Sequence, residues 1–562
     1  MSGGLGKRVC IVGAGSSGLV ATKCFVEEGY EVTTFERNGH VGGLWHYTTD
    51  PTQTTALPGT MVNVSKQGTP FSDFPMPDTI KQTHPTSKEL EAYLESYAEQ
   101  FDIKRHIRFS TEVLGLRRAK DEDQWLVTTR SRDKADSTQE THTFDRVLVS
   151  TGPHTKPSWP ALKGKDEFEG RLIHSQGFKE PHKYAGKTVV VVGISSTASD
   201  SVEFLRLAGA KKIYISHRRS IKVMPRTLRG KAVDHSLSRR ISGILESMRL
   251  VSPALLGFVL GKLLMSMQKS TWPKLLEHPA FGPSRAHPQP LSSIPNVSDN
   301  LPTNLMEGHA ESVQAIDHFS GPNSITLIDG TVLQDIDAVI CATGTSFDIS
   351  ALLHPEDDPT NTKLAPELFS KIRSSKYYSE GRPATWLYRN LLSIQHPHSL
   401  AFIGHLIYKG AWFPLAERQC MALAQLWQGN YPMPSKIEME RNATKHFQWL
   451  IAELNKGFIS HAGFSHELDH DLWFNDVAGT ELYDRTGWGW SGWKFWWTDR
   501  AMYKLIMDGP DTPFALRLFV TKRGRKFWPG ARDAIVKANR EVNELGEKWK
   551  REQELLKKEK SP

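Results

Sequence analysis

The chain has 562 residues, of which 39% are hydrophobic and 23% are charged. At roughly 100 to 200 residues per domain this length allows about three to five domains, and the composition excludes disordered, collagen-like and disulfide-scaffold classes. The 70 Lys and Arg residues against 62 Asp and Glu residues give a formal net charge of +8, which is too dilute over this length to indicate a nucleic-acid partner. We therefore expect a large protein with several cores rather than a small binding module.

The four cysteines, Cys10, Cys24, Cys341 and Cys420, are far apart and form no CxxC pair. This usage favours a reducing compartment, with no structural disulfide and no zinc ribbon. The N-terminus leads directly into an apolar strand, without the basic start and cleavable apolar region of a targeting peptide. We therefore expect a cytoplasmic protein.

The most apolar long segment covers residues 250–267 and contains Pro253 and Lys262. A lysine at the centre of a bilayer costs about 2.5 to 3.5 kcal/mol, so we do not expect this segment to span a membrane. It is expected to lie in a core or on the surface, where peripheral contact with a membrane is an option. The oligomeric state is left open, with a homodimer as one option.

A βαβ unit is predicted at residues 9–37. An apolar strand leads into Gly13-x-Gly15-x-x-Gly18, then a helical stretch, then a second apolar strand that ends at Glu36. The glycines allow a tight turn and a close approach of the backbone to a pyrophosphate at the helix N-terminus. A carboxylate about 20 residues beyond the glycines is placed to accept hydrogen bonds from ribose hydroxyls. The unit therefore predicts a dinucleotide site.

A second copy of this unit is predicted at residues 188–220. Four valines lead into Gly193, and Ser195 and Ala198 replace the later glycines, so the match is looser. The strand after its helix ends in His-Arg-Arg at 217–219, where the first copy has an acid. An acid there favours a free ribose hydroxyl and an arginine favours a 2′-phosphate. The two units thus indicate FAD, or another unphosphorylated ribose, in the first site and NADP in the second.

The motif Phe168-x-Gly170-x-x-x-His174-x-x-x-Phe178 precedes the second unit. It resembles the FxGxxxHxxx(Y/F) fingerprint of the flavin-containing monooxygenases, the class B flavoprotein monooxygenases of the dimethylaniline N-oxide-forming type. The resemblance covers nearly the whole chain through short motifs at residues 36–37, 42–45, 62–66, 71–75, 150–152, 329–331, 342–344, 497–499, 509–513 and 528–532.

The resemblance implies an enzyme that uses FAD, NADPH and O2. In this family NADPH reduces FAD, oxygen adds at flavin C4a, and the hydroperoxide is attacked by a soft nitrogen or sulfur nucleophile of a small molecule, so that no nucleophilic side chain is needed. The resemblance gives Asn63 the catalytic role of hydrogen bonding to the hydroperoxide, together with retained NADP+, in a site that excludes water. It implies no metal.

The candidate cofactor-binding residues fall into two groups. The group around the first unit contains Gly13, Ala14, Gly15, Ser16, Ser17, Gly18, Glu36, Arg37, Gly43, Leu44, Trp45, Val62, Asn63, Val64 and Thr151. The group around the second unit contains Gly193, Ser195, Ser196, Thr197, Ala198, Ser199, Asp200, Arg218, Arg219, Thr343 and Gly344. Arg218 is the first choice for reading the 2′-phosphate and Arg219 is the fallback.

Several candidates also have simpler interpretations. Asn63 could be a turn residue whose side chain caps its own backbone, and Trp45 could be only a core aromatic. Arg218 and Arg219 could be solvated surface charges, although their place at a strand end favours a phosphate ligand. For His174 we expect a structural role that links the domains.

Two further patterns are expected to carry no function. Residues 466–470 spell the HExxH of zinc proteases, but Asp469 and Asp471 lie beside the second histidine and the apolar flanks of a buried helix are missing. Five tryptophans lie in residues 488–497; such rings can form a membrane belt, yet we expect them to pack between domains.

The predicted fold class is α/β, with two Rossmann-like dinucleotide-binding domains and the NADP domain inserted into the FAD domain. The strand at 337–341 is expected to return to the FAD domain. The predicted parts are the FAD domain at 1–167 and 335–449, the NADP domain at 168–334 with an excursion at about 235–302, and a C-terminal section at 450–562 that packs on the FAD domain and ends in a charged helix.

Two rival functions remain open at this stage. A Baeyer–Villiger monooxygenase acting on a ketone shares both dinucleotide sites, but its fingerprint closes with a tryptophan where this chain has Phe178. A flavin-binding sensor or scaffold without turnover is the alternative from another class, and steady NADPH oxidation with oxygen uptake would exclude it. The identity of the substrate does not follow from these motifs.

Overall fold

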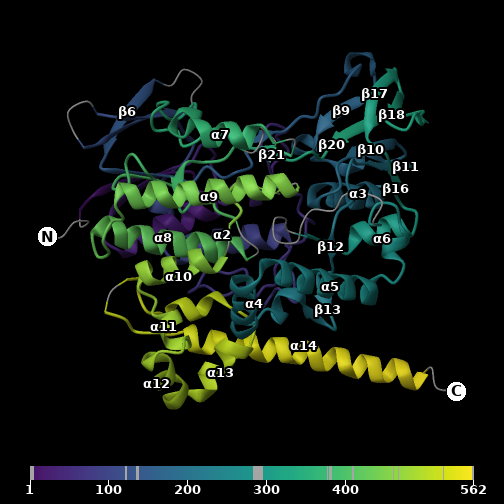
Figure 1. Cartoon of the computed structure of the whole chain (residues 1–562). Coiled ribbons are helices and arrows are strands. Elements are labelled where there is room, and N and C mark those ends of the chain that lie inside the picture. The colour runs from purple at the N-terminus through teal and green to yellow at the C-terminus, as the bar shows by residue number, and fades with distance from the viewer. Residues whose placement is uncertain are drawn as a thin grey trace.

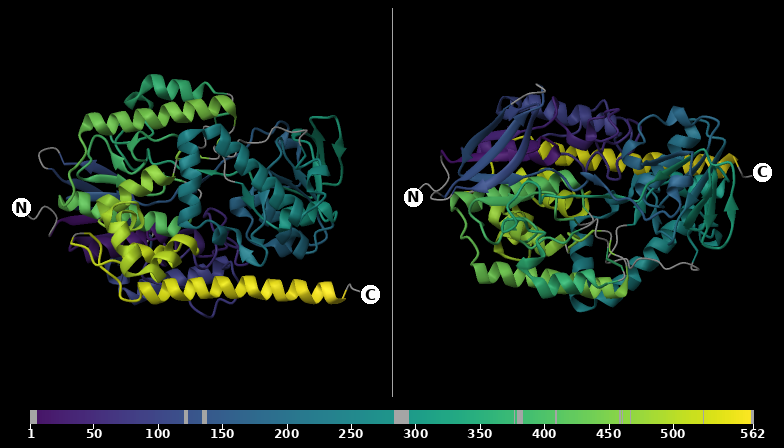
Figure 2. Two further views of the ribbon diagram at one scale, coloured as in Figure 1. Left: turned by 60° about the horizontal axis from the view of Figure 1, so that its bottom comes forward. Right: turned by 90° about the horizontal axis from the view of Figure 1, so that it is seen from above.

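The computed structural model describes residues 6–559, except residues 120–122, 134–137, 283–294, 376, 379–382, 408–409, 458, 460, 466 and 523. A mixed sheet and a parallel sheet form its two halves, and a layer of helices covers the first half (Figure 1). The longest helix, α14, runs along one side of both halves (Figure 2).

The first sheet has seven strands in the order β22-β23-β24-β7-β1-β2-β3. Its centre is a set of parallel strands, because β1 pairs in parallel with β2 and β7; these strands are apolar runs, as expected where both faces of a sheet are covered. The bounds are β1 (Arg8–Val12), β2 (Glu31–Phe35), β3 (Ile107–Arg108), β7 (Arg146–Val149), β22 (Leu387–Tyr388), β23 (Leu392–Ser393) and β24 (Leu400–Phe402).

The second sheet has five parallel strands in the order β16-β11-β10-β20-β9. The order β20-β10-β11 repeats the order β7-β1-β2 of the first sheet, so the internal repeat extends to a third strand. The bounds are β9 (Arg171–His174), β10 (Thr188–Val192), β11 (Lys212–Ser216), β16 (Glu311–Val313) and β20 (Ala338–Cys341).

The expectation that the strand at 337–341 returns to the first sheet is wrong. This strand is β20, which pairs with β10 on one side and β9 on the other. The physical reason is the repeat: β20 is the counterpart of β7, and each strand is followed by a Thr-Gly pair, at 151–152 and 343–344. The chain leaves the second sheet only after this strand.

Two connections between the halves run side by side. The short strands β8 (Lys156–Pro157) and β21 (Thr345–Ser346) pair in an antiparallel manner, and the N–H of Ser158 donates to the carbonyl of Gly344 at 3.0 Å. The ring Nε2 of His174, at the end of β9, lies 2.9 Å from the same carbonyl. His174 therefore links the end of β9 to the connection that returns to the first half, which is a structural role.

Two three-stranded antiparallel sheets complete the halves, and a separate excursion lies between β11 and β16. The sheet strands are β4 (Thr111–Arg118), β5 (Trp125–Ser131), β6 (Gln139–Phe144), β17 (Ile316–Gly321), β18 (Ser324–Leu327) and β19 (Val332–Leu333). The excursion contains β12 (Val223–Met224), β13 (Thr227–Leu228), β14 (Lys231–Ala232), α4 (Arg239–Val251), α5 (Pro253–Thr271), β15 (Asn296–Val297) and α6 (Asn300–Met306).

Helices pack on both sheets, and α1 and α3 follow the first strands of the two repeated units. Of the others, α8 packs on α1 and α10 packs on α8. The bounds are α1 (Ser16–Glu27), α2 (Ser87–Gln100), α3 (Ser196–Leu207), α7 (Pro366–Arg373), α8 (Trp412–Gln428), α9 (Lys436–Lys456), α10 (Glu467–Ala478), α11 (Leu482–Thr486), α12 (Trp490–Thr498), α13 (Arg500–Asp508) and α14 (Ala531–Glu559).

A buried group of charged and polar side chains fastens the C-terminal section to the first half. Arg517 is almost fully buried; its guanidinium donates to Ser72 Oγ at 2.8 Å and to Glu27 Oε2 at 3.2 Å. Glu417 on α8 is fully buried and accepts from the N–H of Ser72 at 2.7 Å. Because a buried charge is tolerated only when it is paired, this group fixes the section after residue 450 against α1 and α8.

The apolar segment at 250–267 is divided between two helices. α4 ends at Val251 and α5 begins at Pro253, where the fixed φ of proline suits a first helical turn. Among the described residues, none of the helices has the length and apolar character needed to cross a membrane. Leu250, Val251 and Phe258 are exposed, so the segment lies on the surface.

The expected packing of the tryptophan run between domains is wrong for most of its rings. Trp488, Trp490 and Trp497 are 89%, 82% and 81% exposed, and Trp493 is about half exposed. The reason is that the buried side of α12 is occupied by Gly492 and Phe495, which leaves the tryptophans on the outer side.

The HExxH pattern lies only partly within the described residues. Its first histidine lies outside the described residues, and Nε2 of His470 lies 2.8 Å from Ser465 Oγ. Within the described ranges no three or more His, Cys, Asp or Glu side chains are grouped so as to hold a metal ion.

Candidate active site

Two of the three glycines in the first turn are required by the chain itself. Gly13 has φ = +101°, and a Cβ there would lie 2.9 Å from the carbonyl oxygen of Ser150. A Cβ at Gly18 would lie 1.8 Å from the carbonyl oxygen of Gly13. These glycines therefore allow the turn and the close packing of helix on strand.

The remaining glycine of the turn, Gly15, is not required by its protein neighbours. It caps the N-terminus of α1 with φ = −70°, and an added Cβ would approach only the Cα of Gly43, at 3.7 Å. The missing side chain instead leaves backbone N–H groups open at a helix N-terminus, where anions bind. This cradle fits the pyrophosphate of a dinucleotide.

Glu36 is buried at the end of β2, where its carboxylate is fixed by two backbone donors. Oε2 accepts from the N–H of Ala14 at 2.8 Å, and Oε1 accepts from the N–H of Asn38 at 2.9 Å. A carboxylate has about four acceptor positions, so both oxygens can still accept from ribose hydroxyls. Arg37, the next residue, is exposed.

The second unit repeats this geometry without the acid. Gly193 has φ = +122°, and a Cβ there would lie 2.4 Å from the carbonyl oxygen of Ala342. Ser195 caps α3, as the second glycine of the turn does in α1. The strand registers place His217 where the first unit has Glu36. The second turn therefore offers a phosphate cradle and no carboxylate for a free 2′-hydroxyl.

The two arginines after β11 differ in their surroundings. Arg218 is exposed. Arg219 is half-buried, with its guanidinium carbon 5.3 Å from the centre of the Tyr377 ring, and burial and the charge of Arg218 lower its pKa. Arg219 is therefore held against an aromatic ring, while Arg218 has room to meet a ligand.

A cavity of about 160 Å³ lies at the N-terminus of α3, between the second unit and a loop of the first half. Its walls come from the loop at 60–63, from the N-terminus of α3 and from the excursion. The lining residues are Trp45, Thr60, Met61, Val62, Asn63, Ser196, Thr197, Ser199, Asp200, Arg226, Asn296 and Val297. The cavity thus brings together side chains that the sequence assigned to two different cofactor sites.

Asn63 is exposed on the wall of this cavity. Its side-chain amide makes no hydrogen bond within the part of the chain that the structure describes. A side chain that capped its own backbone would make one. The turn-cap interpretation is therefore not supported, and the amide is open to solvent or to a ligand in the cavity.

Two lining residues, Arg226 and Asn296, carry no sequence signal. Both are buried, and Arg226 Nε and Asn296 Nδ2 have no hydrogen-bond partner among the described residues, while Asn296 Oδ1 accepts from Ser196 Oγ at 2.7 Å. Buried donors are normally satisfied, so these two fit a ligand with acceptor oxygens. Neither belongs to a cofactor-binding motif, and the fold of the excursion places them here.

The other candidates lie in three settings. Trp45 lines the cavity and also meets the Phe413 ring edge-on at 6.4 Å, so it is more than a core aromatic. Ala198 is fully buried and provides space rather than a contact. Burial raises the pKa of Asp200 to about 6, against the lowering effect of Arg226. Ser16 and Ser17 begin α1, and Gly43 and Leu44 lie in the short 3-10 helix Gly43–Trp45. None of these lines the cavity, and neither do Val64, Thr151, Thr343 and Gly344.

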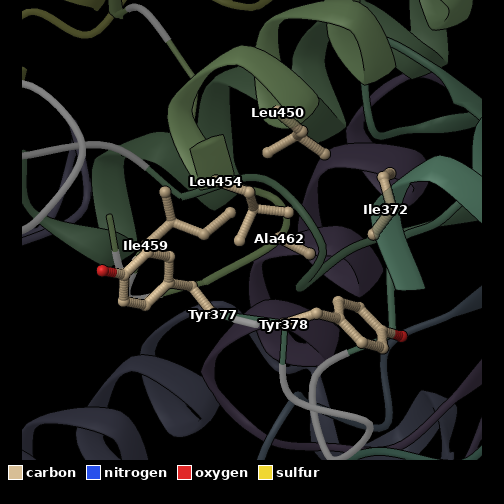
Figure 3. Close-up of a pocket in the computed structure, with 7 residues that line it drawn as sticks. All are labelled: Ile372, Tyr377, Tyr378, Leu450, Leu454, Ile459 and Ala462. Carbon is tan, nitrogen blue, oxygen red and sulfur yellow. The ribbon is translucent and has the colours of Figure 1, made fainter. Parts of the chain in front are cut away.

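A second cavity, between α7 and α9, is much smaller at about 20 Å³. Figure 3 shows aliphatic side chains and two tyrosines, Tyr377 and Tyr378, whose hydroxyl groups point away from each other. Such a volume holds about one water molecule. It is therefore not a substrate site, although Tyr377 is the ring that meets Arg219.

Two Rossmann-like units in one chain define an oxidoreductase with two dinucleotide cofactors. The family described as flavin-binding monooxygenase-like matches residues 6–555. The chain belongs to this family, and it is an FAD-dependent monooxygenase that uses NADPH.

Similar proteins cover almost the full length of the chain. The monooxygenase aurF of Gibberella zeae is 33% identical over 94% of this chain and 97% of its own. Human flavin-containing monooxygenase 5 is 30% identical over 94% of this chain and 91% of its own.

Solved structures of lower identity share the fold. S-allyl-L-cysteine S-oxygenase from Allium sativum has a TM-score of 0.56 at 19% identity, covering 89% of this chain and 95% of its own. A cyclohexanone-bound cyclohexanone monooxygenase has a TM-score of 0.58 at 17% identity, covering 84% and 98%. The predicted α/β fold with two dinucleotide-binding units is confirmed.

Proposed function

We propose that the chain transfers one oxygen atom of O2 to a soft nitrogen or sulfur nucleophile of a small molecule, with electrons from NADPH. The observation that carries the proposal is the cavity at the N-terminus of α3, whose wall includes Asn63, an amide without a hydrogen-bond partner among the described residues. The flavin, when bound, supplies the oxygen chemistry. Because the substrate is then the nucleophile, the cavity lining needs no Cys, His or Lys, and it contains none.

In this proposal each unit of the fold has a separate task. The turn around Gly15 and the carboxylate of Glu36 hold FAD. The N-terminus of α3 holds the pyrophosphate of NADP, and Arg218 binds its 2′-phosphate. Asn63 donates a hydrogen bond toward the reacting oxygen, and closure of the cavity between the two halves excludes water.

A panel of substrates tests the reaction type. Purified protein is given NADPH, oxygen and either a tertiary aryl amine, an alkyl thioether or cyclohexanone, and the oxygenated product is measured against NADPH consumed. We expect the amine or the thioether to be oxygenated. Turnover of the ketone alone would favour the Baeyer–Villiger alternative, which the buried Phe178 in place of a tryptophan argues against. No NADPH oxidation at all would favour a flavin-binding sensor.

Replacing Asn63 with Asp should uncouple the reaction. The carboxylate would repel negative charge that develops on the reacting oxygen, so hydrogen peroxide per NADPH should rise at least fivefold, a loss of about 1 kcal/mol or more in discrimination. Bound flavin and the anaerobic rate of flavin reduction should stay within twofold of the parent. Unchanged product per NADPH would remove Asn63 from the mechanism.

We further propose a cytoplasmic protein that contacts anionic membranes through α4, α5 and the tryptophans of 488–497. The helices carry five cationic residues at 239, 240, 249, 262 and 269. Arg239, Arg240 and Arg249 are paired with acids, which leaves Lys262 and Lys269 for anionic headgroups. α4 packs on α13, which follows α12 (Figure 1), so the apolar residues of α4 and the tryptophans lie on neighbouring helices. Cationic helices with exposed apolar side chains, and exposed tryptophans, are typical of binding at a lipid interface.

Vesicle sedimentation tests this contact. The parent should bind vesicles with phosphatidylserine more strongly than neutral ones, and less in high salt. The triple variant Phe258→Ser, Trp490→Ser, Trp497→Ser should bind at least fivefold more weakly with unchanged flavin content. Ile437→Ser, an exposed position on α9, is the matched control. Equal binding of parent and triple variant would contradict the proposal, and a dimer that the triple variant abolishes would assign the surface to a second copy.

A further inference from the structure

The loop at 62–69, which carries Asn63, is held by the first half on one side. The N–H of Val62 donates to the carbonyl of Pro85, and the N–H of Lys66 donates to the carbonyl of Thr83, both at 2.9 Å. These bonds fix the backbone on either side of Asn63 to the segment that precedes α2.

The excursion of the second half holds the same loop from another direction. Ser65 is fully buried, and both its Oγ and its N–H donate to Asp234 Oδ2, at 2.6 and 3.2 Å. Asp234 lies in the one-turn helix Val233–Ser236, 169 residues further along the chain. A carboxylate from the excursion therefore binds the loop two residues from Asn63.

The C-terminal helix holds the loop from a third direction. The side chain of Gln67 is buried; its Nε2 donates to Glu541 Oε2 on α14 at 2.8 Å, and its Oε1 lies 3.1 Å from Nε2 of His235. One amide thus joins the loop to the excursion and to α14 at once.

These holding elements are closely packed against the loop and against each other. A Cβ at Gly68 would lie 3.0 Å from Val64 Cγ1 and 3.2 Å from Asp234 Oδ2. At Gly230, in the hairpin of β13 and β14, a Cβ would lie 2.4 Å from the Cβ of Trp549 on α14. The excursion and α14 therefore pack against each other and together support the loop.

Several titratable groups face Asp234. Burial raises its pKa, while the hydrogen bonds from Ser65 and the charge of His84 lower it. Burial lowers the pKa of His84 to about 4, with Arg226 and His235 adding to that effect. The side-chain and backbone donors of the loop that reach the Asp234 carboxylate are those of Ser65.

We propose that Asp234, acting through Ser65, is a positioning residue that holds Asn63 in its working geometry, with Gln67 and Glu541 completing the support. The inference rests on the role proposed for Asn63 above. In this proposal the excursion and α14 influence how reduced flavin partitions between oxygenation of substrate and release of hydrogen peroxide. None of these side chains lines the cavity.

Hydrogen–deuterium exchange of the purified protein, without NADPH or substrate, tests the geometric part. Asp234→Ala should speed exchange in peptides covering 61–69 about tenfold or more. Asp234→Asn, which keeps an acceptor oxygen for Ser65, should stay within threefold of the parent. Asp508→Ala removes a different contact of the excursion, that with Arg240 at 2.5 Å, and is the matched control, with no change expected at 61–69.

The effect on function is tested by the hydrogen peroxide released per NADPH oxidised. In Asp234→Ala, peroxide per NADPH should rise at least threefold, while the Michaelis constant for NADPH and the anaerobic reduction rate stay within twofold. The double variant with Asn63→Asp should add little to either single change, because the two residues act through one interaction. If Asp234→Ala does not fold, Ser65→Ala replaces it in both experiments; it removes the shorter of the two bonds to Asp234 together with the bond from the N–H of Gly68 to Ser65 Oγ.

Three outcomes would overturn the inference. They are unchanged exchange at 61–69, faster exchange throughout the protein, and faster exchange at 61–69 with unchanged hydrogen peroxide per NADPH. These are distinct from failure of the function proposed for Asn63, which would appear as unchanged coupling in Asn63→Asp itself.

Discussion

Gly15→Ala is expected to give a folded protein that purifies without flavin. The turn leaves room for a methyl group as far as the chain's own atoms are concerned, since an added Cβ meets only Gly43 Cα at 3.7 Å and φ is −70°. A pyrophosphate at the N-terminus of α1 would meet that methyl directly. Overpacking of this kind costs about 1 to 3 kcal/mol, occasionally more, which corresponds to about a 5- to 150-fold loss of affinity.

The measurement is the flavin absorbance per mole of protein, combined with thermal unfolding of protein stripped of flavin. Gly257→Ala, at a position with nothing within 4 Å, is the matched control and should keep its flavin. Gly18→Ala should fail differently, by loss of the folded protein, because its Cβ would lie 1.8 Å from the carbonyl oxygen of Gly13. Stoichiometric FAD in Gly15→Ala would show that the first unit is not the flavin site.

The sequence predicts the two dinucleotide turns because their determinants are local. Gly13 and Glu36 are 23 residues apart, and the contacts that define the turn, such as Glu36 Oε2 with the N–H of Ala14, lie within that span. The same argument holds for the second unit at Gly193. Spacing in the chain and position in space are closely linked in such a unit.

The rest of the site depends on contacts between distant segments, and the sequence did not predict it. Arg226 and Asn296 reach the cavity only because the excursion folds back over α3, and Asp234 meets Ser65 across 169 residues. The placement of β20 was also missed, although the Thr-Gly pair at 343–344, which matches the pair at 151–152, was a signal for it. The partner with which a strand pairs depends on tertiary packing, and an apolar run in the sequence does not determine it.

Arg218→Ala is expected to remove the preference for NADPH over NADH. A guanidinium on a 2′-phosphate makes a charge-assisted bond of about 1.5 to 3 kcal/mol, which corresponds to about a 10- to 150-fold preference. Arg218 is exposed just beyond β11, and the preceding His217 occupies the register position of Glu36, so no acid opposes a phosphate there. The Michaelis constant for NADPH should therefore rise more than tenfold, while that for NADH should barely change.

Arg219→Ala is the matched control, because its side chain already lies against the ring of Tyr377 at 5.3 Å. It should change the constants for both cofactors by less than threefold. If Arg218→Ala weakened NADPH and NADH equally, the arginine would only position the loop. If Arg219→Ala alone raised the constant for NADPH, it would be the phosphate ligand, and its contact with Tyr377 would then have to open when the cofactor binds. That movement would appear as a change in tyrosine or tryptophan fluorescence on titration with NADP+ but not with NAD+.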